Sequence, residues 1–358
     1  MPRRPTIEDV ARDAGVSKGA VSFALNDRPG VAPATRERIL RVAADLGWTP
    51  SHRGRALAAD RALAVGLVVA RPPETLGADP FFPAFIAGIE ATLAQLGQAL
   101  VLQVVPDRDR EVESYRRLAA DGRVDGVFLT DLRVGDPRPA LLERLGLPAV
   151  VIAPACSDHA AAAACVCVDD RPGIVAAVEH LVSLGHRRIA HVGGPAEFVH
   201  SRSRRDAWAG ALRDAGLRPG PAVESDFSAA GGAAATARLL DLAEPPTAVV
   251  YANDLMAIAG AAVAAGRGLD VPTDLSVTGF DDTEVAAHVR PALTTIRTDA
   301  FGWGRAAADR LTRLVGGTNT DRSAVSPTTM PPPCLVVRDS TAPPRPDRSR
   351  TSPGSELR

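Results

Sequence analysis

Three apolar, strand-like runs of this sequence each end in a pair of polar residues that could bind a ligand. The pairs are Asp169-Asp170, Asn253-Asp254 and Asp281-Asp282. Carboxylates accept hydrogen bonds and amides both donate and accept them, which is the combination that hydroxyl groups require. Asp254 and Asp282 are also well placed to cap the helix that would follow each run. The pattern therefore predicts a site for a polar small molecule, with Asn253 and Asp281 as its main candidates.

The residue types give little support to enzyme chemistry. No nucleophile, acid–base pair or metal-ligand cluster assembles, and the single lysine, Lys18, lies far from the polar pairs. A GxSxG match at 15–19 lacks the preceding strand that a hydrolase nucleophile needs, and a GxGxxA match at 302–307 follows no clear strand. Cys165 and Cys167 have His159 nearby, but their spacing fits no zinc site and indicates small buried residues. We expect no catalytic residue, no metal and no cofactor.

The segments that must position the polar pairs alternate between short apolar runs and longer amphipathic stretches. The runs interpreted as strands are AVGLVVA (64–70), ALVLQVV (99–105), VDGVFLT (124–130), AVVIA (149–153), CVCVD (165–169), IAHVGG (189–194), AVVYAND (248–254), SVTGFDD (276–282) and CLVVRD (334–339). Near-continuous apolar strands between helices indicate parallel sheets covered on both faces. Because one sheet would not hold so many strands comfortably, we predict two doubly wound α/β subdomains. Ligands bind beyond the carboxyl ends of such strands, where the polar pairs lie.

The N-terminal segment predicts short helices instead. In TIEDVARDAGVSKGAVSFALN (6–26) apolar residues recur at helical spacing, Thr6 and Ser17 suit N-caps, and Gly15 suits a turn. The face of the second helix that points away from the core would carry Lys18, Gly19, Ser22 and Phe23. Two short helices joined by such a turn form a helix-turn-helix, whose second helix enters the major groove of DNA.

The charge distribution agrees with a DNA-binding head. A third helix is predicted at 33–46, and the basic stretch SHRGRALAAD (51–60) is either a linker or a marginal helix that would not form in isolation. Residues 1–61 carry a net charge of +4, and residues 62–338 carry −6. A basic head on an acidic body is typical of a nucleic-acid-binding module joined to another domain.

These patterns divide the chain into four parts: an all-α helix-turn-helix domain (1–50), a hinge (51–61), an α/β domain (62–339) and a tail (340–358). The tail is rich in Pro, Ser and Arg, so we expect it to be disordered and dispensable. It lacks the leucine heptads of a tetramerising bundle, which favours a dimer. The N-terminus has no secretory signal and no apolar run predicts a membrane span, so we expect a cytoplasmic protein with reduced thiols.

The order of these parts resembles the LacI/GalR family of bacterial transcriptional regulators. The resemblance covers residues 6 to about 340 and rests on the segments TIEDVARDAGVS, VSFALN, TRERILRVAADLGWTP, HLVSLGHRRIAHVGG, YANDLMAIAGA, DLSVTGFDDTEVAAHVRPALTTI and LVVRDST. It implies a dimeric repressor of a pseudo-palindromic operator, with a core similar to periplasmic sugar-binding proteins. A small effector between the two subdomains would decide whether the linker folds as a hinge helix on DNA.

The resemblance also implies which residues contact DNA. They are Thr6, Ser17, Lys18, Gly19, Ser22, Phe23, Asn26, Arg55 and Leu57. Leu57 would be the apolar wedge that bends the duplex from the minor groove. Ala32 and Gly54 depart from the family pattern, and each weakens its helix by about 1 kcal/mol.

The implied effector contacts are Phe82, Asp170, Arg204, Asn253 and Asp281. Arg204 would clamp hydroxyl groups and Phe82 would stack on the effector, so a sugar or sugar derivative is expected. A purine is the alternative, which an aromatic content of 4% makes less favourable because a planar base needs a ring on both sides. An enzyme or a sugar-binding protein on the same core is the remaining alternative, against which the DNA-binding head argues.

Overall fold

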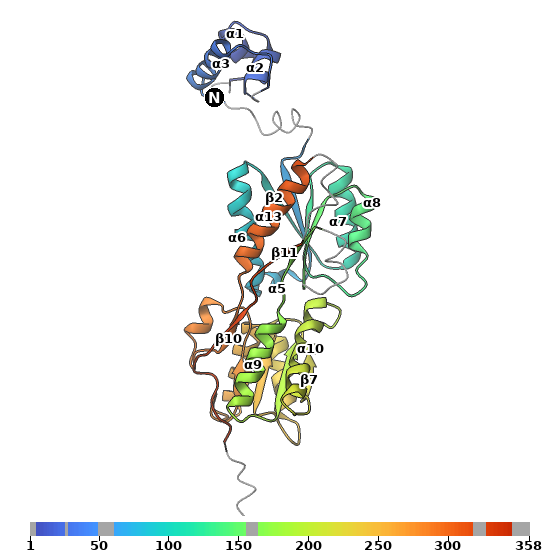
Figure 1. Ribbon diagram of the computed structural model, residues 1–358, viewed down its shortest axis with the longest axis vertical. Coiled ribbons are helices and arrows are strands. Elements are labelled where there is room, and N and C mark those ends of the chain that lie inside the picture. The colour runs from blue at the N-terminus through green and yellow to red at the C-terminus, as the bar shows by residue number, and fades with distance from the viewer. Residues whose placement is uncertain (1–4, 26–27, 49–60, 155–163, 318–326, 346–358) are drawn as a thin grey trace, which may run out of the picture. The chain divides into compact units, whose positions relative to one another are not determined.

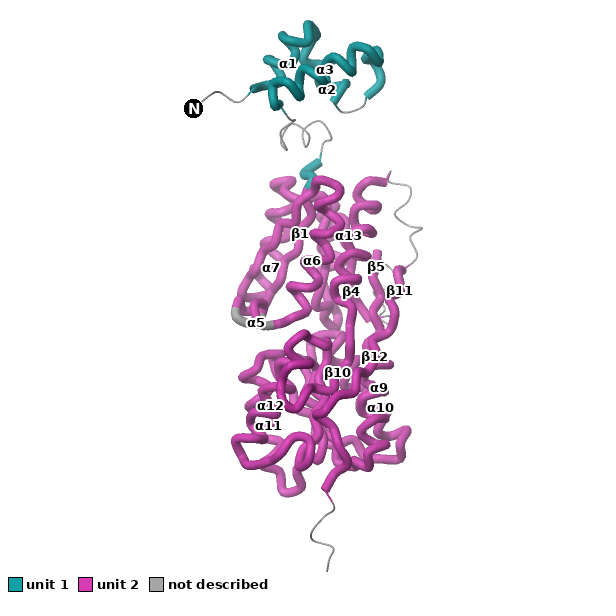
Figure 2. Tube along the Cα trace, turned by 90° about the vertical axis from the view of Figure 1, so that its left-hand side faces the viewer, with its two compact units in different colours: residues 1–63 teal, residues 64–358 magenta. Residues whose placement is uncertain are grey.

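The computed structural model describes residues 5–25, 28–48, 61–154, 164–317 and 327–345. The chain divides into two compact units, residues 1–63 and 64–358 (Figure 2). Within the described residues, no helix combines the length and apolar character needed to cross a membrane.

The first unit is a bundle of three helices, α1 (Ile7–Asp13), α2 (Lys18–Leu25) and α3 (Pro33–Asp45). Its small core consists of Val10, Ala11, Ala14, Val21, Ala24, Ile39 and Ala43. All of these lie at the helical spacing that the sequence predicts, because one face of each helix must be removed from water.

The turn between α1 and α2 has the predicted chemistry. Gly15 adopts a φ of 64°, which is the left-handed conformation that glycine tolerates best. Ser17 caps α2, since its hydroxyl oxygen accepts a hydrogen bond of 3.2 Å from the N–H of Ala20. At the start of α1, the Asp9 carboxylate accepts hydrogen bonds from the N–H and the hydroxyl of Thr6. The predicted helix-turn-helix is therefore confirmed.

The first lobe of the second unit contains a parallel sheet with the strand order β11-β5-β4-β3-β1-β2. Its strands are β1 (Ala64–Ala70), β2 (Ala99–Val105), β3 (Val127–Leu129), β4 (Ala149–Ala153), β5 (Cys165–Cys167) and β11 (Thr328–Thr329). Two helices, α6 (Phe81–Leu93) and α13 (Ala300–Gly316), cover one face (Figure 1). The other face is covered by α7 (Arg108–Ala120) and α8 (Arg138–Arg144). The short helix α5 (Pro73–Ala78) follows β1, and the 3-10 turn η1 (Ala94–Leu96) extends α6.

The second lobe contains a four-stranded parallel sheet with the order β7-β6-β8-β9. The strands are β6 (Ile189–Gly193), β7 (Ala222–Glu224), β8 (Ala248–Tyr251) and β9 (Ser276–Thr278). One face packs against α9 (Arg171–Ser183) and α10 (Val199–Asp214), the other against α11 (Ala229–Leu240) and α12 (Asp254–Gly266). The turn η2 (Glu284–Ala287) leads to β10 (Thr295–Arg297), which pairs antiparallel with β12 (Cys334–Val336).

The predicted fold class is confirmed: both sheets are parallel and helices cover both faces of each. Every predicted run contains a strand, and the runs at 64–70, 99–105 and 149–153 match β1, β2 and β4 residue for residue. The strands that the sequence did not indicate are β7, β10 and β11, each of two or three residues. Strands this short carry too few residues for a periodic pattern.

The predicted disordered tail is wrong for residues 340–345. Ser340 is 1% exposed, and its hydroxyl donates to the carbonyl of Val277 at 2.7 Å and accepts from the N–H of Thr294 at 2.8 Å. The carbonyl of Ala342 accepts from the hydroxyl of Ser276 at 3.1 Å. These bonds satisfy buried groups of β9 and of the segment before β10, which polar composition alone does not reveal. The described α/β unit therefore extends to 345 rather than ending at 339.

Candidate functional site

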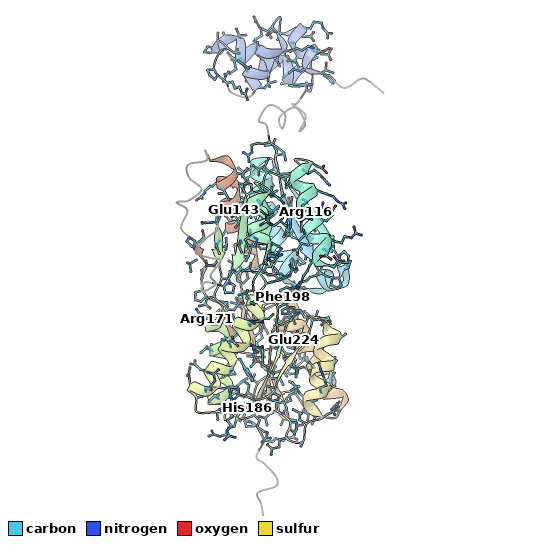
Figure 3. All side chains as sticks on the ribbon, turned by 90° about the vertical axis from the view of Figure 1, so that its right-hand side faces the viewer. Arg116, Glu143, Arg171, His186, Phe198 and Glu224 are labelled. Atoms are coloured by element: carbon cyan, nitrogen blue, oxygen red, sulfur yellow. The ribbon has the colours of Figure 1, made fainter. Side chains whose placement is uncertain are left out.

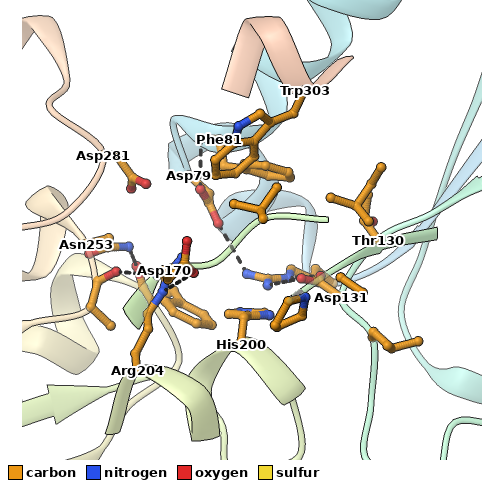
Figure 4. A pocket seen from close by; sticks show the side chains of 18 residues that line it. Asp79, Phe81, Thr130, Asp131, Asp170, His200, Arg204, Asn253, Asp281 and Trp303 are labelled. Atoms are coloured by element: carbon orange, nitrogen blue, oxygen red, sulfur yellow. Dashed lines mark hydrogen bonds and ion pairs between the residues drawn. The ribbon is translucent and has the colours of Figure 1, made fainter. Parts of the chain in front are cut away.

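A cavity opens between the two lobes of the second unit, where the carboxyl ends of both sheets face each other (Figure 4). It encloses about 750 Å³, including its mouth. The residues around it that carry polar or aromatic groups are Arg71, Asp79, Phe81, Thr130, Asp131, Asp170, His200, Arg204, Phe227, Asn253, Asp281 and Trp303. Many of them follow strands of either sheet or begin helices, as the strand-end rule predicts, whereas Arg204 lies within α10.

Four of the five residues expected to contact an effector line this cavity: Asp170, Arg204, Asn253 and Asp281. The fifth prediction, Phe82, is wrong, because its side chain is 1% exposed and belongs to the core of the first lobe. The neighbouring Phe81 lines the cavity instead. Successive residues of a helix point about 100° apart, so only one of two adjacent phenylalanines can face the cavity, and the sequence does not say which.

Arg204 is held in place by two hydrogen bonds. Its Nε donates to Oδ2 of Asp170 at 2.8 Å, and its Nη1 donates to the carbonyl of Ala252 at 2.9 Å. The guanidinium also lies 3.7 Å from the ring centroid of Phe280, a distance suited to a cation–π contact. Its Nη2 has no partner among the described residues and remains available to donate.

Asn253 caps the helix that follows it. Its Oδ1 accepts from the N–H of Met256 at 2.8 Å, and its Nδ2 donates to the carbonyl of Phe227 at 2.9 Å.

The prediction that Asp254 and Asp282 cap the following helices is wrong. Asp254 accepts from the N–H and the hydroxyl of Thr283, and burial raises its pKa to about 6. Asp282 forms ion pairs with Arg297 and Arg338, at 2.6 and 2.5 Å.

Asp281 differs from its neighbour in having no side-chain hydrogen bond to any described residue. Its φ is 106°, a backbone conformation that non-glycine residues rarely adopt. The surrounding protein raises the pKa of its carboxyl well above the usual value, chiefly by excluding water and despite the charge of Arg204. Strained backbone and an unpaired carboxylate occur together where a site is shaped for a ligand.

Arg71 is a site residue that the sequence analysis missed. It is 6% exposed, and it binds both oxygens of Asp131, with Nε at 2.6 Å and Nη2 at 2.7 Å. Its Nη1 lies 3.3 Å from Oδ2 of Asp79. Arg71 and Asp131 each directly follow an apolar run, so the strand-end rule indicated both positions, but neither is part of a polar pair.

The guanidinium of Arg71 also connects the two lobes. It lies 5.4 Å from the ring centroid of Phe82 in its own lobe, and 5.2 and 5.0 Å from those of Phe198 and Phe227 in the other. Phe198 lies at the boundary between the lobes (Figure 3). Burial disfavours the ionised form of Asp131, yet the charge and hydrogen bonds of Arg71 hold its pKa below the usual value.

Aromatic rings gather around the cavity despite their low number in the chain. The ring centroids of Phe81 and Trp303 are 6.1 Å apart, and those of His200 and Phe227 are 5.6 Å apart. Three of the few Phe and Trp rings, together with His200, thus line one cavity, which composition does not reveal.

On the first unit, the exposed face of α2 carries the expected residues. Lys18, Gly19 and Phe23 are exposed and Ser22 is half-buried. Lys18 forms an ion pair with Glu8. Thr6 and Ser17 lie at the N-terminal ends of α1 and α2. The expected DNA contacts Asn26, Arg55 and Leu57, and most of the predicted hinge, lie outside the described residues.

Comparison with known proteins agrees with this architecture. Residues 6–51 match the profile described as "Bacterial regulatory proteins, lacI family", and residues 178–341 match that of the "Periplasmic binding protein-like domain". The transcriptional regulator CelR of Thermobifida fusca is 35% identical over 89% of this chain and 94% of its own length. The chain belongs to the LacI family. It is a transcriptional regulator with a helix-turn-helix domain and a periplasmic-binding-like domain.

Further relatives support the same assignment. The repressor CytR of Escherichia coli is 32% identical over 84% of this chain and 87% of its own length. Among solved structures, a CelR–cellobiose complex aligns with a TM-score of 0.71 and 33% identity, over 94% of this chain and all of the other. The lac repressor dimer bound to operator and the anti-inducer ONPF aligns with a TM-score of 0.80 and 31% identity, over 95% of this chain and all of the other.

Proposed function

We propose that this regulator is a dimeric repressor that binds a pseudo-palindromic operator and responds to a sugar or sugar derivative in the cleft. The observation that carries the effector class is the set of hydrogen-bonding groups on the second-lobe side: Nη2 of Arg204, Oδ1 of Asp170 and the carboxylate of Asp281. Together they can donate to and accept from several hydroxyls at once. The solved cellobiose complex of CelR and the operator complex of the lac repressor agree with this proposal.

The proposal assigns a role to each site residue. Arg204 donates to effector hydroxyls, Asp281 accepts from them, and Phe81 and Trp303 cover an apolar face of the ring. Asn253 offers only its second amide hydrogen and second oxygen lone pair, since its cap bonds occupy the others. On the head, Lys18, Gly19 and Phe23 contact bases, and Leu57 wedges into the minor groove. The protein acts in the cytoplasm, binding its effector without converting it.

DNA binding is tested by footprinting on the region upstream of the gene. We expect one protected pseudo-palindrome and an affinity that falls steeply with salt, because the head neutralises phosphates. Equal affinity for every duplex would contradict operator recognition.

The effector class is tested by a thermal-shift screen of neutral sugars, sugar derivatives and purines. A ligand at 100 times its Kd stabilises the protein by about 2.7 kcal/mol. In Arg204→Ala, the affinity for a sugar found in the screen is expected to fall by about 3 kcal/mol, or roughly 100-fold, since buried polar groups lose their partner. Operator affinity in the absence of sugar is expected to persist.

Arg205→Ala is the matched control. Arg205 is the next residue of α10, is half-exposed, and pairs with the exposed Asp206 rather than lining the cleft. Equal losses in the two variants would mean that the effector binds elsewhere. A purine that stabilises the protein while no sugar does would favour the alternative class, for which the clustered aromatic rings provide stacking surfaces.

A further inference from the structure

The cleft contains more acidic than basic side chains. Among the described residues that line it, four are aspartates, namely Asp79, Asp131, Asp170 and Asp281, and two are arginines, namely Arg71 and Arg204. The one histidine, His200, does not correct this imbalance, because burial and the charge of Arg204 lower its pKa to about 3 and keep the ring neutral.

Both arginines of the cleft already form hydrogen bonds with neighbouring carboxylates of the protein. Arg71 binds Asp131 through two nitrogens and approaches Asp79 through the third, so each of its nitrogens already donates to a carboxylate. Arg204 directs one nitrogen to Asp170 and one to a backbone carbonyl. Only Nη2 of Arg204 has no partner among the described residues, and an anionic group that bound it would share the cleft with the carboxylates of Asp170 and Asp281.

Two carboxylates are left with accepting capacity. Oδ1 of Asp170 is buried and has no hydrogen-bond partner, although Oδ2 of the same group binds Arg204. The carboxylate of Asp281 has no hydrogen-bond partner among the described residues, and Figure 4 shows it on the same side of the cavity as Asp170 and Arg204. Both groups can only accept while they are ionised. These two carboxylates therefore require hydrogen-bond donors from a ligand.

We infer that this cleft selects an effector without any anionic group: a polyol, plain or amino-substituted, that donates hydrogens to Asp281 and to the free oxygen of Asp170. This inference rests on the proposed function, since it concerns the same cleft. It excludes phosphorylated sugars and sugar acids, because their charge would lie against unpaired carboxylates in a site with little water to screen it.

The test compares related ligands that carry different charges. Glucose, glucosamine and glucose 6-phosphate form one set, and cellobiose and cellobionate form another. Dissociation constants are measured by calorimetry. In the wild type we expect the anionic member of a set to bind roughly 100-fold or more weakly than its neutral parent.

The decisive variant is Asp281→Asn. Asn keeps the size of the side chain and tolerates a positive φ, while it removes one negative charge. We expect the neutral-to-anionic ratio of affinities to fall by about tenfold, whatever happens to each affinity alone. The matched control is Asp282→Asn, which removes the same charge one residue away, where the carboxylate pairs with Arg297 and Arg338. Its ratio is expected to match the wild type.

The outcomes separate this inference from the proposed function. An anionic member that binds as tightly as its parent, or a ratio unchanged in Asp281→Asn, overturns the charge selection while leaving a sugar effector intact. If no member of either set binds, the inference is tested by the thermal stability of the ligand-free protein. Asp281→Asn should then melt above the wild type at pH 8, because it removes an unpaired charge. A variant no more stable than the wild type would mean that Asp281 is paired within the protein or already protonated at this pH, and the inference fails. If the Asp281→Asn protein does not fold, the Asp281→Ser protein is compared with the wild type instead.

Discussion

Replacing Arg71 by methionine should destabilise the α/β unit strongly. Methionine keeps most of the length of the side chain but removes the charge that Asp131 and Asp79 face at 2.6 and 3.3 Å. Arg71, Asp79 and Asp131 are all largely buried, with side chains 7–14% exposed, so water replaces the lost partner poorly. Removing one member of a buried pair costs about 3–5 kcal/mol. The lost contacts to Phe198 and Phe227 add to this.

The effect is measured by urea unfolding of the full chain, monitored on the α/β unit. The matched control is Arg117→Met, which breaks the pair with Glu113 on the exposed face of α7, where both side chains are 44–62% exposed. Such a pair contributes about 0.3–0.5 kcal/mol. Arg71→Met together with Asp131→Asn should recover part of the loss, because no uncompensated charge then remains on Asp131.

The dependence on pH gives a second check. Arg71 holds the pKa of Asp131 below its usual value, so this pair contributes stability above about pH 4 that is lost as the pH falls through the lowered pKa. The difference in stability between wild type and Arg71→Met should therefore narrow toward low pH. An Arg71→Met protein that is as stable as Arg117→Met at pH 7 would refute the reasoning that the buried pair matters.

Three further predictions concern the C-terminal segment and the hinge. Deletion from Ser340 onward should cost about 2–4 kcal/mol in thermal or urea unfolding, because the carbonyl of Val277 and the N–H of Thr294 lose their partner, whereas deletion from residue 346 should be neutral. Equal stability of the two truncated chains would contradict this. In the hinge, Leu57→Ala should weaken operator binding while sparing non-specific DNA, and Gly54→Ala should tighten the operator complex by up to about 1 kcal/mol. Gel shifts measure both, and a Leu57→Ala protein with wild-type operator affinity would exclude the wedge.

The sequence by itself determined the features that depend on neighbouring residues. Helical spacing, the left-handed Gly15 and the Ser17 cap specify the helix-turn-helix within a few turns of chain. The near-continuous apolar runs specify β1, β2 and β4 to the residue, and for β1 this is because burial on both faces leaves no room for polar positions. The strand-end rule also found Asp170, Asn253 and Asp281, since parallel strands bring their carboxyl ends to one edge.

Only the tertiary structure decided how these polar groups are shared between the protein and a ligand. Asp281 and Asp282 are adjacent, yet Asp282 meets Arg297 and Arg338 while Asp281 faces the cleft. Asp131 meets Arg71 across 60 residues of sequence, and Ser340 reaches the carbonyl of Val277 across 63. The type of a residue and its neighbours in the sequence determine which hydrogen bonds its side chain is able to make. Which of them form depends on the segments that packing brings alongside, and no local pattern contains that information.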